Sequence, residues 1–299
     1  MRLGIAITRF GWPGGAPAIR PALDRIATQV DASGADSLWF MDHLFQIPLY
    51  GAADDPLPDA YTLLPYVAAR TTRVQLGTMV TCGLFRPPAL LIKMVTTLDL
   101  LSDGRARLGI GAGGYERELY GLGFELPPLR DRFGRLAETL RLAHQMWAGD
   151  RTPFHGEYVR VPEPINEPNV ARRPPILVGG GGERRTLALV ARYADACNFF
   201  EPLGGDTIRH KFAVLREHCE RVGRPFEEID RTTYGELLLR TPEHPEGDSV
   251  DQVVDRFGAL AELGVDEAVV GLNNPLDASV HELLGEVVRQ TRPLVPKGR

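Results

Sequence analysis

The chain has 299 residues, of which 43% are hydrophobic and 24% are charged, and its formal net charge is −5 at pH 7. These values are typical of a compact folded protein and exclude a disordered or fibrous chain. The acidic balance, without a run of basic residues, argues against a nucleic-acid surface, so the sequence favours small molecules as partners.

Short apolar runs rich in β-branched residues alternate with segments of helical period along the whole chain. The first four strand–helix pairs are expected at 3–8 with 17–33, 37–41 with 60–70, 74–80 with 89–101, and 107–111 with 130–147. The next four are expected at 176–178 with 183–193, 196–200 with 207–222, 234–239 with 250–263, and 268–272 with 280–291.

Strands that are separated by helices run parallel to one another. Eight such units in a chain of this length predict a closed (β/α)8 TIM barrel, as one domain over residues 1–299, with a doubly wound open sheet as the alternative. Two segments rich in Pro and Gly, 114–129 and 149–173, interrupt the alternation as insertions. We expect the first insertion to cross the C-terminal face of the barrel, where such folds carry their chemistry.

The first residues hold an apolar stretch too short for a signal peptide, and no later segment approaches the roughly 18 apolar residues of a membrane span. The sequence therefore predicts a cytoplasmic protein without a membrane partner. Cys82, Cys197 and Cys219 lack CxxC spacing, and no HExxH or GxSxG motif is present. Neither a metal site nor a hydrolytic nucleophile is expected.

Four consecutive glycines, Gly179–Gly182, follow the fifth expected strand and open its helix. Backbone N–H groups and the positive end of the helix dipole favour an anion there, and Arg184 and Arg185 add positive charge. We interpret the run as a phosphate site. The alternative is a flexible turn that packs the helix against the strand.

A second glycine run, Gly109–Gly114, formally satisfies GxGxxG. The dinucleotide fingerprint opens a helix at the first βα turn, whereas a loop follows this run and three βα units precede it, so we exclude that role. The run predicts a strand end stripped of side chains that a flat ring can approach. Glycines that ease close packing inside the barrel explain it equally well.

Asp42 and His43 stand at the end of the second expected strand. A histidine beside an acid can exchange protons near neutral pH, which makes this pair a candidate for acid–base catalysis. The alternative is a loop histidine that is held by hydrogen bonds.

Four segments carry a resemblance to a known family: SLWFMDHLF at 37–45, VQLGTMVT at 74–81, LDLLSDGRARLGIGAGGYERE at 98–118, and PPILVGGGGERR at 174–185. In order and spacing the chain resembles the luciferase-like monooxygenase superfamily, and within it the oxidoreductases that depend on the deazaflavin coenzyme F420. The branch that uses flavin mononucleotide (FMN) is the nearest alternative. The resemblance implies a barrel with the cofactor ring at its C-terminal mouth, and members often form homodimers.

The resemblance also implies roles for individual residues. His43, beside Asp42, would exchange a proton as hydride moves to or from the cofactor, and a cis peptide is expected between Met79 and Val80 under the ring. The positions that match cofactor-binding residues are Asp42, Met79, Val80, Thr81, Cys82, Ala112, Gly113, Arg117, Gly179, Gly180, Gly181 and Gly182.

One departure from the family concerns the substrate. A sugar-phosphate-oxidising branch carries a catalytic glutamate where this chain has Gly114, and Glu116 and Glu118 lie nearby but out of register. No cluster of basic residues suits a phosphorylated substrate. With this departure, the resemblance implies hydride transfer between F420 and a small, largely uncharged organic substrate. An FMN-dependent monooxygenase and a barrel that binds a phosphorylated ligand without turnover are the alternatives.

Aromatic residues in the loops after the expected strands complete the sequence-based picture of the site. We expect them to form an apolar wall over the ring. They are Phe10, Trp12, Phe45, Phe85 and Tyr115.

Overall fold

The computed structural model describes residues 1–298, and eight of their strands close into a parallel barrel. The barrel strands are β1 (Arg2–Ile7), β2 (Ser37–Asp42), β3 (Gln75–Cys82), β4 (Ala106–Gly111), β7 (Ile176–Gly179), β8 (Ala196–Phe200), β9 (Asp230–Leu237) and β10 (Glu267–Leu272). Each strand pairs with the next barrel strand along the chain, and β10 closes the ring against β1. The predicted (β/α)8 barrel is confirmed.

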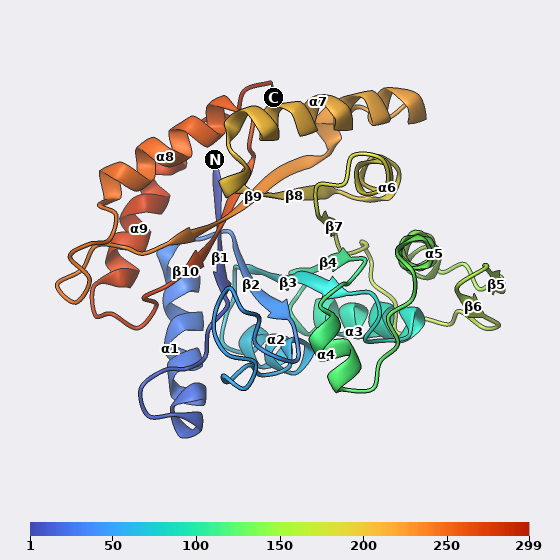
Figure 1. Cartoon of the computed structure of the whole chain (residues 1–299), viewed down its shortest axis with the longest axis horizontal. Helices are drawn as coiled ribbons and strands as arrows, with labels where there is room; N and C mark the ends of the chain where they lie inside the picture. The colour runs from blue at the N-terminus through green and yellow to red at the C-terminus, as the bar shows by residue number, and fades with distance from the viewer. Residues whose placement is uncertain (299) are drawn as a thin grey trace.

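Helices surround the strands as an outer ring (Figure 1). They are α1 (Ala16–Ser33), α2 (Ala60–Ala68), α3 (Pro88–Leu101), α5 (Leu129–Trp147), α6 (Thr186–Tyr193), α7 (Gly205–Val222), α8 (Val250–Glu262) and α9 (Val280–Thr291). Shorter elements are α4 (Glu116–Gly121), the hairpin strands β5 (Phe154–His155) and β6 (Arg160–Val161), and the 3-10 turns η1 (Glu201–Leu203) and η2 (Phe226–Glu228). Across residues 1–298 no helix has the length and apolar character that a membrane crossing requires.

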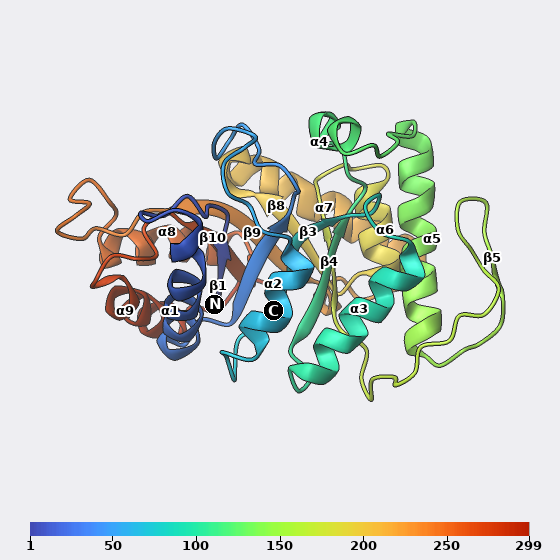
Figure 2. The same cartoon turned by 90° about the horizontal axis from the view of Figure 1, so that it is seen from below.

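The two insertions take different positions. The first contains α4, which lies at the same end of the barrel as the loop after β2 (Figure 2). The second contains the β5–β6 hairpin and lies beside α5 rather than over the C-terminal face. Glu138 of α5 holds the hairpin there, because its carboxylate accepts hydrogen bonds from the backbone N–H groups of Glu157, Tyr158 and Val159.

The strand expected at 234–239 begins earlier, since β9 spans Asp230–Leu237. Polar residues open this strand and therefore hid it from a search for apolar runs. Arg231 is buried against Asp266, with 2.9 Å between Nε and Oδ2, and the Thr232 hydroxyl donates to a carbonyl of β8. These residues are buried because each polar group has a partner within the barrel wall.

A buried ion pair crosses the N-terminal end of the barrel interior. Arg107 of β4 donates to Glu267 of β10 at 2.9 Å, and the Ser37 hydroxyl of β2 donates to the same carboxylate. Burial opposes ionisation of Glu267, but Arg107 and Arg2 outweigh it, so the pKa of Glu267 lies below its usual value. Charged side chains therefore fill the barrel floor, and each is paired.

The C-terminal end of β3 bulges into the barrel. Its register against β4 shifts between Gly77 and Thr81, and this shift brings Val80 against the neighbouring strands. A Cβ on Gly111 would lie 3.1 Å from the Val80 side chain, and one on Gly179 would lie 2.9 Å from it. The glycines at these two strand ends therefore make room for the bulge.

Gly109 is required for the same reason. A Cβ at this position would lie well within 3.0 Å of the Thr78 carbonyl oxygen, which is a backbone atom and cannot move aside cheaply. Close packing inside the barrel, which the sequence left as an equal alternative, is therefore the reason for Gly109.

We predict that Gly109→Ala lowers the free energy of unfolding by about 3 kcal/mol, because the added methyl group overpacks a rigid site. The control is Gly258→Ala in α8, where a Cβ would meet nothing within 4 Å and should stabilise the helix by about 1 kcal/mol. Urea unfolding of both variants measures the difference. Equal stabilities for the two variants would contradict this account of the bulge.

Candidate functional site

A cavity of about 390 Å³ opens at the C-terminal ends of the barrel strands. Its lining comes from β1, β2, β3, β4, β7, β8 and β9, together with α4 and the loop after β2. Most of the residues singled out from the sequence line it: Asp42, His43, Met79, Val80, Thr81, Cys82, Ala112, Gly113, Gly179 and Gly180. Arg117, Gly181 and Gly182 lie outside this lining, and Arg117 is exposed on α4.

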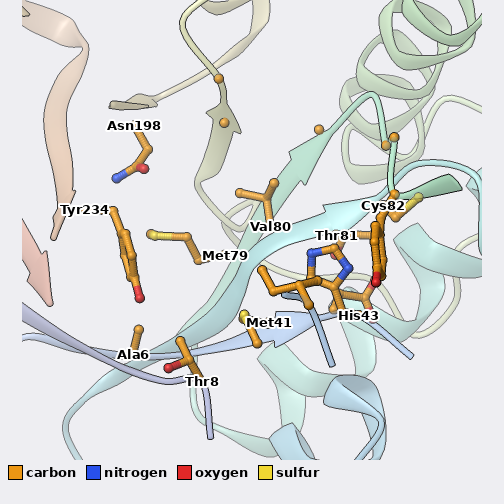
Figure 3. A pocket seen from close by; sticks show the side chains of 18 of the residues that line it. Ala6, Thr8, Met41, His43, Met79, Val80, Thr81, Cys82, Asn198 and Tyr234 are labelled. Atoms are coloured by element: carbon orange, nitrogen blue, oxygen red, sulfur yellow. The ribbon is translucent and has the colours of Figure 1, made fainter. Parts of the chain in front are cut away.

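The bulge of β3 forms the middle of the cavity wall. The peptide bond between Met79 and Val80 is cis, as the resemblance implied. Figure 3 shows both side chains between Tyr234 on one side and His43 on the other. The bulge therefore separates two walls of different chemistry.

His43 and Glu118 form the first of these walls. The two side chains contact each other at 2.7 Å between Nδ1 and Oε1, and the imidazole is 30% exposed whereas the carboxylate is 2% exposed. The second carboxylate oxygen accepts hydrogen bonds from the backbone N–H groups of Leu44 and Phe45. The catalytic glutamate of the sugar-phosphate-oxidising branch aligns with Gly114 and not with Glu118. Glu118 nevertheless lies in direct contact with His43, the candidate catalytic residue.

Asp42 lies next to His43 but is buried and paired with a different group. Its Oδ2 accepts a hydrogen bond from Arg86 at 2.7 Å, and Arg86 also binds Asp59 at 2.8 Å. Its Oδ1 is buried and has no protein partner among the described residues. Burial raises the pKa of Asp42 to about 6, although Arg86 acts in the opposite direction.

A polar cluster of Tyr50, Tyr234 and Glu236 forms the opposite wall. The two hydroxyl oxygens are 2.6 Å apart, and each also contacts Oε1 of Glu236, at 2.9 Å for Tyr50 and 2.7 Å for Tyr234. Burial raises the pKa of both phenols. Sequence reasoning missed this cluster, because Tyr234 stands inside a strand rather than after one.

The glycine run after β7 forms a bare loop at the side of the cavity. Gly180 has a φ of 105°, a conformation that side chains rarely adopt. α6 begins at Thr186 rather than at 183, so residues 180–185 are available as loop. Lys211 of α7 reaches this loop and donates to the Gly181 carbonyl at 2.7 Å, a contact that the sequence did not predict.

The expected aromatic wall is largely wrong. Of the five residues proposed for it, only Tyr115 lines the cavity, with its ring 5.8 Å from that of His43. Phe10 is buried in the hydrophobic core, and Phe85 packs against Phe124. Phe40 and Phe200, which belong to strands, line the cavity instead. A position after a strand was therefore a poor guide for these aromatic residues, because Phe10 turns into the core and Phe85 packs against another ring.

A parallel barrel whose strand ends surround one cavity, with a histidine and buried carboxylates in its wall, defines the class of TIM-barrel enzymes. The model of the luciferase-like monooxygenase family matches residues 1–247, and the chain belongs to that family. Relatives with similar sequences include F420-dependent enzymes, which supports the branch that the resemblance indicated.

Two of these relatives are F420-dependent glucose-6-phosphate dehydrogenases. The one from Kineococcus radiotolerans is 36% identical over 244 residues, which cover 79% of this chain and 69% of the relative. The one from Amycolatopsis mediterranei is 30% identical over 231 residues, which cover 75% of this chain and 67% of the relative. The alignments thus leave about a third of each relative unmatched.

Solved structures share the fold at low sequence identity. An F420-dependent secondary alcohol dehydrogenase superposes with a TM-score of 0.82 at 16% identity, covering 97% of this chain and 99% of that chain. EDTA monooxygenase from Chelativorans sp. BNC1 gives a TM-score of 0.81 at 16% identity, covering 99% and 95%. These similarities establish the barrel fold, and the chemistry has to be inferred from the residues of the site.

We predict that Asp42→Asn changes how stability depends on pH. The pKa of Asp42 is raised from 3.8 to about 6, so the folded protein binds this proton more tightly than the unfolded chain does. The protonated carboxyl therefore stabilises the fold below pH 3.8, and this contribution is lost as the pH rises through about 6. Relative to the variant, the wild type should lose about 3 kcal/mol over this range.

Denaturant unfolding of both proteins at several pH values measures this difference. Asp54→Asn in the exposed loop after β2 is the control, and its stability should follow the wild type at every pH. Parallel curves for the wild type and Asp42→Asn would show that Asp42 keeps an ordinary pKa.

Proposed function

We propose that the protein transfers a hydride between F420 and a small, largely uncharged organic substrate that binds in the cavity at the barrel mouth. The observation that carries the proposal is the partly exposed His43 ring in the cavity wall beside the bulge of β3. The F420-dependent dehydrogenases among the sequence relatives support the choice of cofactor.

The residues around the cavity suit a deazaflavin with a phosphate on its chain. Met79 and Val80 give an apolar surface for the ring, and the unpartnered Oδ1 of Asp42 can accept a hydrogen bond from a ring N–H. The bare loop at Gly180 and the N-terminus of α6 suit the phosphate. When bound, F420 would accept a hydride from the substrate or return one to it.

The protein's own part in this reaction is to manage protons and position the substrate. The partly exposed imidazole of His43 can hydrogen-bond a substrate in the cavity and exchange a proton with it. Arg86, which bridges Asp42 and Asp59, keeps the strand end of β2 fixed relative to α2. Apolar residues make up much of the lining and exclude water from the reacting atoms.

The substrate class follows from the charges in the wall. Within the described part of the chain no arginine or lysine lines the cavity, and Glu236 stands behind the far wall. An anionic substrate would lose its hydration there and gain no cationic partner. Although the relatives act on a sugar phosphate according to their names, we infer an uncharged substrate for this chain.

Two alternative functions can be tested against this proposal. An FMN-dependent monooxygenase would use the same phosphate loop, but the sequence relatives favour F420. A barrel that binds a phosphorylated ligand without turnover would need the glycine loop and not His43. A cytoplasmic homodimer, with residues 1–299 acting as one domain, also stays part of the proposal.

We predict that the purified protein binds F420 at least about tenfold more tightly than FMN. Quenching of the fluorescence of its three tryptophans measures both affinities.

His43→Asn should keep F420 affinity within about threefold while hydride transfer falls by about 10²- to 10⁴-fold. The matched control is His155→Asn on the exposed hairpin. Tighter binding of FMN, or unchanged turnover in His43→Asn, would contradict the proposal.

Substrate charge can be tested separately with the F420-loaded enzyme. We expect kcat/KM for uncharged secondary alcohols to exceed that for glucose 6-phosphate by at least about tenfold, because the cavity wall offers the phosphate no cation. Loss of cofactor absorbance measures the rate. Saturable oxidation of glucose 6-phosphate at a higher kcat/KM would overturn the inferred substrate class and leave the cofactor assignment intact.

A further inference from the structure

Three nitrogen atoms converge on the buried carboxylate of Glu118. Two are the backbone amides of Leu44 and Phe45, at 2.8 and 3.3 Å from Oε2, and the third contact is Nδ1 of His43 at 2.7 Å from Oε1. The acid comes from α4, after β4, whereas its three partners follow β2. The pair is therefore assembled only when the first insertion folds over the barrel mouth.

α4 packs closely against the loop that carries these partners. A Cβ on Gly121, the last residue of α4, would lie 2.9 Å from the Phe45 ring, so the helix can approach only with glycine there. Glu118 itself is 2% exposed, which removes most solvent screening from its contact with His43. The carboxylate is thus held in place from both sides.

Counting hydrogens assigns the tautomer of the imidazole. An ionised carboxylate only accepts hydrogen bonds, and the amide N–H groups of Leu44 and Phe45 only donate them. The third contact is complete when Nδ1 of His43 also carries a hydrogen. In the neutral ring the other nitrogen, Nε2, then has a free lone pair and no hydrogen.

We propose that Glu118 is a positioning residue that fixes neutral His43 as the Nδ1–H tautomer and leaves Nε2 as the proton acceptor of the site. This inference deepens the proposed function, and its catalytic part rests on that function. A carboxylate that orients an imidazole in this way also stabilises the imidazolium that forms when the ring takes a proton.

The assignment suits oxidation of an alcohol. Nε2 takes the hydroxyl proton, and the electron pair of the broken O–H bond forms the C=O bond. The hydrogen on the carbon of this C=O group would leave with the electron pair of its C–H bond, as a hydride transferred to F420. Glu118 keeps its contact with Nδ1, and the proton ends on Nε2 of His43.

The tautomer can be measured without cofactor or substrate. Ring nitrogen NMR of protein labelled in its seven histidines distinguishes a protonated Nδ1 from a protonated Nε2, and loss of one ring signal in His43→Asn assigns His43. We expect the wild-type ring, when neutral, to carry its hydrogen on Nδ1. A hydrogen on Nε2 in the wild type would overturn the inference, whatever the fate of the proposed hydride transfer.

Glu118→Gln reverses the tautomer by design. The carboxamide oxygen can still accept from the amides of Leu44 and Phe45, which turns its NH₂ group toward Nδ1 and moves the ring hydrogen to Nε2. We expect hydride transfer to fall by about 10²- to 10⁴-fold while F420 affinity stays within about threefold. The matched control is Glu116→Gln, an exposed position on the same helix, which should change neither tautomer nor rate.

The outcomes separate a positioning role from a structural one. A reversed tautomer with F420 binding retained supports the inference. Equal NMR spectra and equal rates for Glu118→Gln and Glu116→Gln would overturn it. The inference would also be overturned if Glu118→Gln lost folding, cofactor affinity and rate together while the tautomer of the folded fraction stayed unchanged. Glu118 would then serve only to hold α4 against the loop after β2.

Discussion

The site depends on the space that the bulge of β3 requires. Val80 can turn into the barrel only because Gly111 of β4 and Gly179 of β7 present no side chain to it, and the Thr78 carbonyl lies where a Cβ on Gly109 would stand. The same crowding fixes the height at which Met79 and Val80 form the middle of the cavity wall. The shape of the cavity at the bulge is therefore set by close packing that only glycine permits at these three positions.

Two buried carboxylates flank the bulge in opposite surroundings. Asp42 shares Arg86 with Asp59 and keeps one oxygen without a protein partner. Glu118 contacts the His43 ring and is held by two backbone N–H groups, and no arginine or lysine of residues 1–298 pairs with it. A carboxylate beside a fixed cation anchors a strand end, whereas one held by amides can orient a ring whose charge changes. The two acids of one cavity wall are therefore held by partners of different kinds.

The sequence predicted what depends on chain order and missed what depends on contacts across it. Apolar runs located the barrel strands, and the positions just after β2, β3 and β4 located most of the cavity wall. The start of β9 was missed because its polar Arg231 is buried against Asp266, the residue before β10. Glu118 and Tyr234 were missed for a related reason, since their roles arise from contacts with residues more than seventy positions away, Glu118 with His43 and Tyr234 with Tyr50. A local sequence pattern does not indicate which distant residues will be in contact.

The ion pair at the barrel floor has a consequence for how the protein can change through evolution. Arg107 and Glu267 stand on β4 and β10, which lie on opposite sides of the closed sheet, and they meet at the end of the barrel remote from the cavity. Neither residue of this ion pair lines the cavity. Substitutions in the mouth loops can therefore change the cavity lining while the floor keeps its charge balance. The end of the barrel that the ion pair stabilises and the end that shapes the cavity can therefore change separately in evolution, although both are built on the same eight strands.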